Sequence, residues 1–274
     1  MAEGNKGFAP IGSCQIYYEE KGDGQPLVMI HAGVADSRQW NNEFERFAAE
    51  YRVVRYDLRG YGKSHPVDEE FSHMGDLGGL LGFLEISDPA VLMGCSMGGT
   101  LAMDYALANP ATVRALIMVG SGPSGLRLDV PSHPKADEAE EAYDAGDLGL
   151  AAELETQIWF DGMGRTPQDV DPDMRALAYD MNRIALSHDA LHLGTRRPDA
   201  EEPAAARLAS LNVPVLIVVG EHDIPFIQAA ADIMLSNLPV SKKVAIPDAA
   251  HLPNMDQPER FQSAVVAFLN GVLT

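Results

Sequence analysis

The sequence predicts an α/β fold with a doubly wound, mostly parallel sheet, interrupted by a helical insertion. Five short runs of Val, Leu, Ile and Met lack polar alternation, which is typical of parallel strands covered on both faces. These runs span residues 27–31, 52–57, 90–94, 114–120 and 213–220. Segments with helical spacing alternate with them, as expected when helices cover both faces of a sheet. These helical segments span 39–50, 74–86, 97–109, 225–238 and 258–273.

Two further strands complete the predicted sheet. Residues 14–20 suit an antiparallel edge strand, and 243–246 form a weak strand near the end of the chain. No strong strand is predicted between residues 121 and 209. There, 133–160 and 174–193 have amphipathic helical patterns, and a loop rich in Pro and Asp lies between them.

Composition limits the classes of partner and the compartment. The formal net charge of −20 disfavours binding to nucleic acid or to anionic membranes. Two cysteines, Cys14 and Cys95, do not suggest a disulfide framework and favour a reducing compartment. We see no signal peptide and no apolar run of about 20 residues, so we expect a cytoplasmic protein. A homodimer is left open.

The segment Gly94-Cys95-Ser96-Met97-Gly98 is the strongest indication of chemistry. It follows a predicted strand and precedes a predicted helix, which is the setting of a nucleophile elbow. Glycines let neighbouring backbones pack closely around the turn, and Ser96 would project from it. The N–H of Met97 would begin the helix and face a developing oxyanion. A glycine-rich turn without chemistry is the alternative.

A nucleophilic serine needs a base and an orienting carboxylate. His251 follows the weak strand in a loop before the last helix, where it can reach back over the strand ends. Asp223 follows the strand 213–220, and Glu221 is close enough to compete for the same role. The order serine, aspartate, histidine along the chain is that of α/β-hydrolases.

The turn after the first buried strand offers a second oxyanion donor, the N–H of Gly33, with Val34 as a weaker candidate. We expect His31 in the same turn to be structural. We also expect Arg59 to stabilise the next strand end by pairing with Asp57.

Two other features are weaker indications. His188 and His192 stand four residues apart on a predicted helix, as zinc ligands do. No third ligand is evident, so we predict neither a metal nor another cofactor. Cys95 beside the serine suits a small buried apolar role better than a thiol mechanism.

Together these segments resemble the α/β-hydrolase family over nearly the whole chain. The blocks "HAGVADSRQW", "YDLRGYGKS", "GCSMGG", "GEHD" and "AHLPNMDQPERF" stand in family order. The first departs from the common form because Ala32 replaces a glycine. The resemblance implies a hydrolase core, residues 1–120 and 210–274, with residues 121–209 as a helical cap that shapes the pocket. It also makes six side chains candidates for the pocket lining: Val34, Trp159, Phe160, Met163, Tyr179 and Met181. For the five that lie in the cap, packing inside the cap is the alternative.

The predicted function is hydrolysis of small or medium, largely apolar carboxylic esters through an acyl-enzyme. The last block is similar to versions in carboxylesterases, lactonases and enol-lactonases, so a lactonase, including one for acyl-homoserine lactones, is the nearest alternative. A perhydrolase and a C–C bond hydrolase follow. A ligand sensor that uses the same fold with little turnover is an alternative of a different class.

Overall fold

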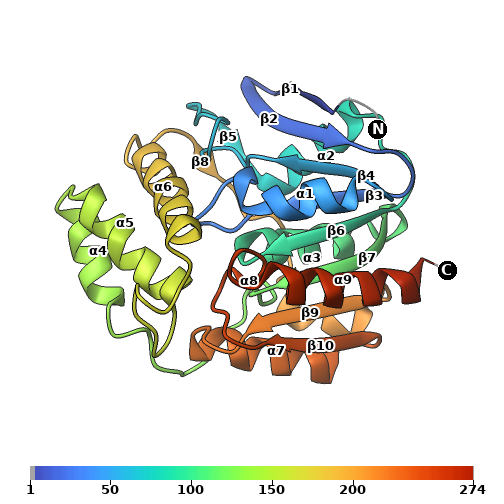
Figure 1. Ribbon diagram of the computed structural model, residues 1–274. Coiled ribbons are helices and arrows are strands. Elements are labelled where there is room, and N and C mark those ends of the chain that lie inside the picture. The colour runs from blue at the N-terminus through green and yellow to red at the C-terminus, as the bar shows by residue number, and fades with distance from the viewer. Residues whose placement is uncertain (1–3, 274) are drawn as a thin grey trace.

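The computed structural model describes residues 4–273, and one large sheet runs through them. The sheet has eight strands within the described residues, in the order β1-β2-β4-β3-β6-β7-β9-β10. Pairing is parallel from β4 through β10, whereas β1 and β2 are antiparallel (Figure 1). The strands are β1 (Asn5–Ile11), β2 (Cys14–Lys21), β3 (Pro26–Ile30), β4 (Arg52–Tyr56), β6 (Ala90–Cys95), β7 (Val113–Val119), β9 (Val215–Gly220) and β10 (Ser241–Ile246).

The predicted α/β sheet is confirmed, with one correction at its edge. The five apolar runs form β3, β4, β6, β7 and β9, and the two weaker predictions form β2 and β10. However, β2 is internal, because β1 pairs with it on its outer side. Of the side chains in β1, only that of Ala9 is buried. An edge strand with so little burial has no apolar run by which a sequence pattern could find it.

Helices cover both faces of the sheet (Figure 1). On one face, α2 (His73–Phe83), α3 (Met97–Ala108) and α7 (Pro225–Asn237) share an apolar core with the strands. On the other face, α1 (Asn41–Phe47) and α9 (Pro258–Val272) contribute to a second core. The parallel strands all end at one edge, so the loops that follow β3, β6 and β9 meet there.

The insertion between β7 and β9 is mostly helical and lies at one end of the sheet (Figure 1). It contains α4 (Ala136–Asp144), α5 (Leu148–Thr156), a π-helical turn η3 (Gln157–Asp161) and α6 (Pro172–Asp189). The pattern over 133–160 is therefore two helices, divided where Gly146 adopts a φ of +76°. The two-residue strand β8 (Thr195–Arg196) pairs with β5 (Glu70–Phe71), which the sequence did not indicate because each is so short. The domain boundaries at 120 and 210 stay a prediction.

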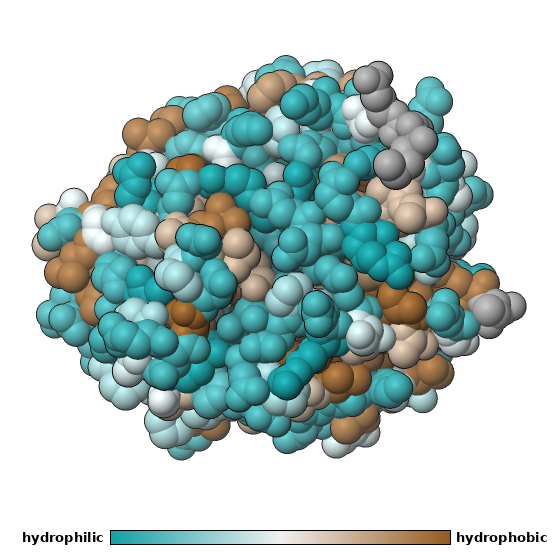
Figure 2. Space-filling view, in the orientation of Figure 1, coloured by the Kyte–Doolittle hydropathy of each residue, from teal (hydrophilic) through white to brown (hydrophobic). Residues whose placement is uncertain are grey.

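Figure 2 shows a largely hydrophilic face with scattered apolar side chains. Among residues 4–273, no helix has both the length and the apolar character that crossing a membrane requires.

Candidate active site

Ser96 lies on a sharp turn between β6 and α3, and the two flanking glycines make this turn possible. Its backbone has φ 51° and ψ −116°, a conformation that side-chain-bearing residues rarely adopt. A Cβ on Gly94 would lie 2.2 Å from the carbonyl oxygen of Gly98, and one on Gly98 would lie 2.5 Å from that of Ile30. Larger residues are therefore excluded on both sides, and the strand–turn–helix setting predicted for Ser96 is present.

His251 and Asp223 form a buried pair at the same edge of the sheet. The imidazole Nδ1 lies 3.0 and 2.9 Å from the two carboxylate oxygens of Asp223. Both side chains are almost fully buried. The loops reach this position because two glycines leave room: a Cβ on Gly120 would lie 2.8 Å from the His251 carbonyl oxygen, and Gly220 is as tightly packed against this loop. Glu221 is exposed, so Asp223 is the carboxylate that contacts His251.

Gly33 and Met97 lie side by side beyond Ser96. Atoms of the Met97 side chain lie 3.8 Å from the position that a Cβ on Gly33 would occupy. Met97 is the first residue of α3, where a helical N–H has no partner four residues back. The Ala32 N–H donates to the Gln39 amide oxygen at 2.9 Å, so this group is already used within the turn. Because the Ala32 N–H is used in this way, the N–H groups that follow it, those of Gly33 and Val34, remain the candidates in this turn.

A buried amide network joins this turn to the loop of His251. Asn254 donates to the Gln39 carbonyl oxygen at 2.8 Å and to a Glu43 carboxylate oxygen at 3.1 Å, and it accepts from the Gln39 amide at 3.2 Å. Gln262 donates to the other Glu43 oxygen at 3.0 Å. Burial raises the pKa of Glu43 to about 7 despite these donors. The network holds the segments that carry Gly33 and His251 against each other.

A cavity of about 340 Å³ opens onto Ser96 and His251. Trp159 forms part of its wall: its ring lies 4.6 Å from the imidazole of His251, and its carbonyl oxygen accepts the His251 N–H at 3.2 Å. Other lining side chains come from the turn after β3, the loop after β4, and helices α5 and α6: Val34, Tyr61, Glu155, Asn182, Leu186 and Asp189.

The predicted pocket residues divide into two groups. Val34 and Trp159 line the main cavity, and Phe160 lines a narrow void of about 10 Å³ next to it. The other three, Met163, Tyr179 and Met181, are not among the residues that line either space. Met181 is completely buried in the core, so it has the packing role that the sequence left as the alternative.

Several lining residues were missed by sequence reasoning, and most lie on one face of α6. Asn182, Leu186 and Asp189 recur at the spacing of a single helix face, a signal that was available in the sequence. Asn182 donates to Glu155 at 2.8 Å. Burial, and repulsion from Asp189, raise the pKa of Glu155. Tyr61 comes from a loop that only the fold brings to the cavity.

Two expectations about the scaffold have different outcomes. His31 is buried, and its ring bonds the Ala32 carbonyl oxygen and the Leu58 N–H, as a structural residue would. Arg59 does not pair with Asp57, so that expectation is wrong. The guanidinium instead bonds Asp76 and Glu69, because the chain turns it toward α2 and the strand β5. Asp57 accepts backbone N–H groups of the neighbouring turns.

The two weaker sequence indications are also resolved. Helix α6 ends at Asp189, so His188 and His192 are not an i, i+4 pair on one helix. His188 bonds the Gly60 carbonyl oxygen at 3.2 Å. Within the described part of the chain, no group of three or more His, Cys, Asp or Glu side chains is placed to hold a metal ion. Cys95 is fully buried, and burial raises the pKa of its thiol to about 12.

Comparison with known proteins places this geometry in a family context. A model described as "Alpha/beta hydrolase family" matches residues 27–264. A pimeloyl-[acyl-carrier protein] methyl ester esterase from Nitrosospira multiformis is 25% identical, over 94% of this chain and 99% of that protein.

Two further proteins extend the comparison. A 2-hydroxy-6-oxononadienedioate/2-hydroxy-6-oxononatrienedioate hydrolase from Pseudomonas putida is 29% identical, over 93% of this chain and 91% of that protein. The structure of a thermophilic esterase from Thermogutta terrifontis, with malate bound, superposes with a TM-score of 0.77 at 27% identity and covers all of both chains.

Proposed function

The chain belongs to the α/β-hydrolase family and is a carboxylic-ester hydrolase, and on this premise we propose that Ser96, His251 and Asp223 form its catalytic triad. The observation that carries the proposal is the buried hydrogen bond between His251 and Asp223, at 2.9 Å, beside a strained serine that lines the same cavity. A structural histidine would not require a serine on such a turn facing the same space.

The proposed reaction proceeds through an acyl-enzyme. His251 accepts the proton of the Ser96 hydroxyl as the oxygen attacks the ester carbonyl, and Asp223 stabilises the imidazolium that forms. The tetrahedral intermediate collapses, the C–O bond to the alcohol breaks, and His251 gives its proton to the leaving alkoxide. Water then attacks the acyl-enzyme while His251 accepts its proton, and Ser96 leaves with that proton restored. No cofactor is used in these steps.

The N–H groups of Met97 and Gly33 are the proposed oxyanion donors. Met97 follows Ser96 in the chain, and Gly33 lines the same cavity as Ser96. Donors held in place before the reaction stabilise the developing charge without reorganisation. The amide network of Gln39 and Asn254 supports this assignment, because it fixes the turn on which Gly33 lies.

The proposed substrates are small to medium acyl esters or lactones. The cavity presents Val34, Trp159 and Leu186 as apolar surface, and its volume of about 340 Å³ suits a molecule of that size. Residues 121–209 act as the cap in this proposal, because α5, α6 and the turn η3 between them supply one wall of the cavity.

The first test is labelling with a fluorophosphonate, which reacts with activated serines. Intact mass should show one adduct, and peptide mapping should place it on Ser96. The Ser96→Ala variant should form no adduct, and its kcat for a short p-nitrophenyl ester should fall by at least about three orders of magnitude. Labelling of another residue, or activity retained by the variant, would refute the assignment. An acyl-homoserine lactone assayed in parallel separates lactonase from esterase activity.

A matched pair of variants tests the carboxylate. Asp223→Asn removes the charge in contact with His251 and should lower kcat by about four orders of magnitude, as the equivalent change does in serine proteases. Glu221→Gln removes an exposed charge two residues away and should change kcat less than about twofold. The opposite ranking would transfer the role to Glu221.

A further inference from the structure

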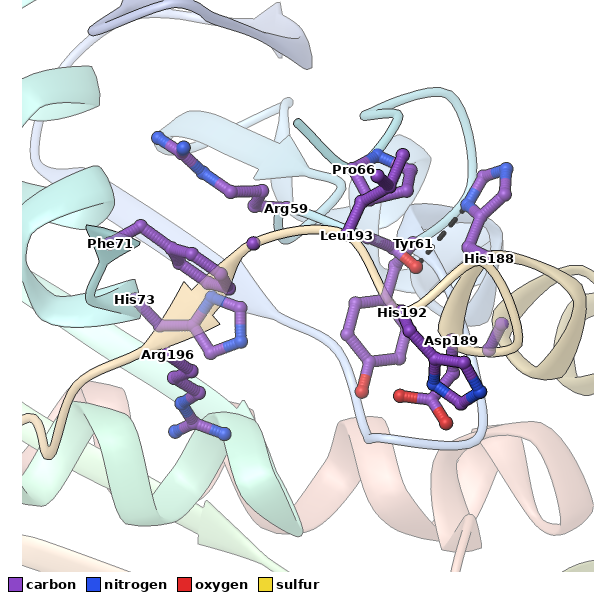
Figure 3. A pocket seen from close by; sticks show the side chains of 13 residues that line it. Arg59, Tyr61, Pro66, Phe71, His73, His188, Asp189, His192, Leu193 and Arg196 are labelled. Atoms are coloured by element: carbon purple, nitrogen blue, oxygen red, sulfur yellow. Dashed lines mark hydrogen bonds between the residues drawn. The ribbon is translucent and has the colours of Figure 1, made fainter. Parts of the chain in front are cut away.

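A second cavity of about 400 Å³ adjoins the one above Ser96, and its chemistry differs. Tyr61, Ala185 and Asp189 line both cavities, so the two spaces meet at these residues. In Figure 3 the Tyr61 ring stands between His73 on one side and Asp189 on the other. We call the second space the His73 chamber and define it by Tyr61, Phe71, His73, His188 and Arg196.

His73 is an unusual lining residue because it is buried and lacks polar partners. Its side chain is 2% exposed, and its Nδ1 has no hydrogen-bond partner among the described residues. Its ring packs edge-on against Phe71, and in Figure 3 the Arg196 side chain begins near the imidazole while its guanidinium extends away from the ring. Buried polar groups are normally satisfied, so an imidazole of this kind in a cavity wall suggests a site for a ligand.

The charged side chains that line the chamber are two arginines, Arg59 and Arg196, and one carboxylate, Asp189. Burial, followed by the nearby cations Arg196 and Arg59, holds the pKa of His73 well below its usual value. His73 is therefore a neutral imidazole in a cavity wall whose charged side chains are mostly cationic, an environment that favours an anion. Arg59 is already bonded to two carboxylates. Arg196 makes one ion pair, with Asp199 at 2.6 Å, and its side chain is 41% exposed, so it retains donors for a ligand.

The chamber reaches the edge of the proposed catalytic machinery. Arg196 contacts the Met97 sulfur at 3.5 Å, and the Tyr61 hydroxyl lies 3.9 Å from the same atom. Burial raises the pKa of Tyr61 to about 12, so this hydroxyl remains a donor. On the other side, the cavity above Ser96 carries the carboxyl groups of Glu155 and Asp189, which disfavour an anion there. Asp189 borders both spaces, whereas Glu155 lines only the cavity above Ser96 and the two arginines line only the chamber, so the chamber is the more favourable of the two for an anion.

We propose that the His73 chamber binds a carboxylate at the far end of the substrate, with Arg196 as its main partner, while the ester lies above Ser96. The proposal rests on the proposed function for the orientation of the substrate, and it makes the half-esters of straight-chain dicarboxylic acids the preferred class. The carboxylate remains unchanged in the reaction, and only the ester bond at Ser96 is broken.

Kinetics with paired substrates test the chamber. Monomethyl esters of the diacids from succinic to suberic acid are compared with methyl esters of the monocarboxylic acids of equal chain length. At one or more lengths the half-ester should have the lower KM, and Arg196→Gln should raise that KM by roughly tenfold to a hundredfold, the loss expected for a hydrogen bond to a charged group. The KM of the neutral ester should change less than about twofold, which shows that the variant is folded.

Arg197→Gln is the matched control. Arg197 is the next residue, its side chain is 64% exposed and paired with Glu70, and it does not line the chamber. This variant has the same change of net charge and should leave both KM values within about twofold. An equal effect of both variants on the half-ester, or an equal effect of Arg196→Gln on both substrates, would overturn the proposal.

Calorimetry keeps this test separate from the test of the proposed function. The same half-esters are titrated into the Ser96→Ala protein and into the double variant Ser96→Ala/Arg196→Gln, and no turnover is needed. Loss of binding in the double variant alone supports the chamber even if Ser96 proves not to be the nucleophile. Absence of half-ester binding to Ser96→Ala, beside normal hydrolysis of neutral esters by the unmodified chain, would refute the chamber and leave the proposed function intact.

Discussion

The buried carboxyl group of Glu43 predicts a specific dependence of stability on pH. Its side chain is fully buried, and its folded-state pKa of about 7 lies above the ordinary value of 4.5. Between these two pH values the folded protein binds more protons than the unfolded chain does. The free energy of unfolding therefore falls as pH rises through this window. Glu43→Gln removes the ionisation and should remove this loss.

The size of the effect follows from the two pKa values. One pKa unit corresponds to about 1.4 kcal/mol, so ionising Glu43 in the folded state costs roughly 3 kcal/mol in total. About 1.4 kcal/mol of this cost is present by about pH 5.5, and the remaining ~2 kcal/mol appears between about pH 5.5 and about pH 8.5. In Glu43→Gln the new side-chain amide can accept from Asn254 through its oxygen, and the partly exposed Gln262 can turn its own amide to accept from the new N–H.

Urea unfolding at pH 5.5 and at 8.5 measures the prediction. The stability of Glu43→Gln relative to the unmodified protein should increase by about 2 kcal/mol from the lower to the higher pH. The control is Glu45→Gln on the same helix, whose side chain is 66% exposed and paired with Lys21. The reasoning is refuted if the relative stability of Glu43→Gln is the same at both pH values, or if Glu45→Gln shows as large a change.

Two further predictions concern the scaffold. Gly98→Ala places a Cβ 2.5 Å from the backbone oxygen of Ile30 and should destabilise the protein by about 3 kcal/mol or more. In Gly82→Ala, within α2, the new Cβ meets no atom within 4 Å, and the variant should be more stable by about 0.5–1 kcal/mol. Urea unfolding checks both, and equal shifts would contradict the steric argument. Asp76→Asn weakens the buried ion pair with Arg59 and should lower the free energy of unfolding by about 3 kcal/mol, as measured by thermal unfolding. A change below about 0.5 kcal/mol would show that Arg59 does not need this partner.

Local patterns carried most of the fold and the centre of the site. Strands buried on both faces have continuous apolar runs, so β3, β4, β6, β7 and β9 were readable from the sequence. The glycines around Ser96 were equally readable, because a Cβ at Gly94 or Gly98 would lie within about 2.5 Å of neighbouring main chain and other residues are excluded there. The antiparallel edge strand β1 was not, since it buries almost nothing.

The sequence alone also left several contacts undecided, because they join residues far apart along the chain. The sequence favours Asp223 but leaves Glu221 as a rival, and only the turn after β9 directs Asp223 to His251. Arg59 was expected to pair with Asp57, but the fold brings Asp76 and Glu69 to its guanidinium. Cytoplasmic location, like the limits of the cap, stays a prediction from sequence.

The sequence by itself therefore determined the fold class and the glycine turn at Ser96, and it pointed to the three residues proposed as catalytic, because apolar runs, glycine spacing and polar residues after strands are local features. Only the tertiary structure decided what surrounds them. It brings α6 and the loop after β4 to one wall, so that two cavities meet at Tyr61 and Asp189, one with arginines in its lining and the other with Glu155. Side-chain packing between distant segments sets the shape and potential of a pocket, and no local periodicity encodes it.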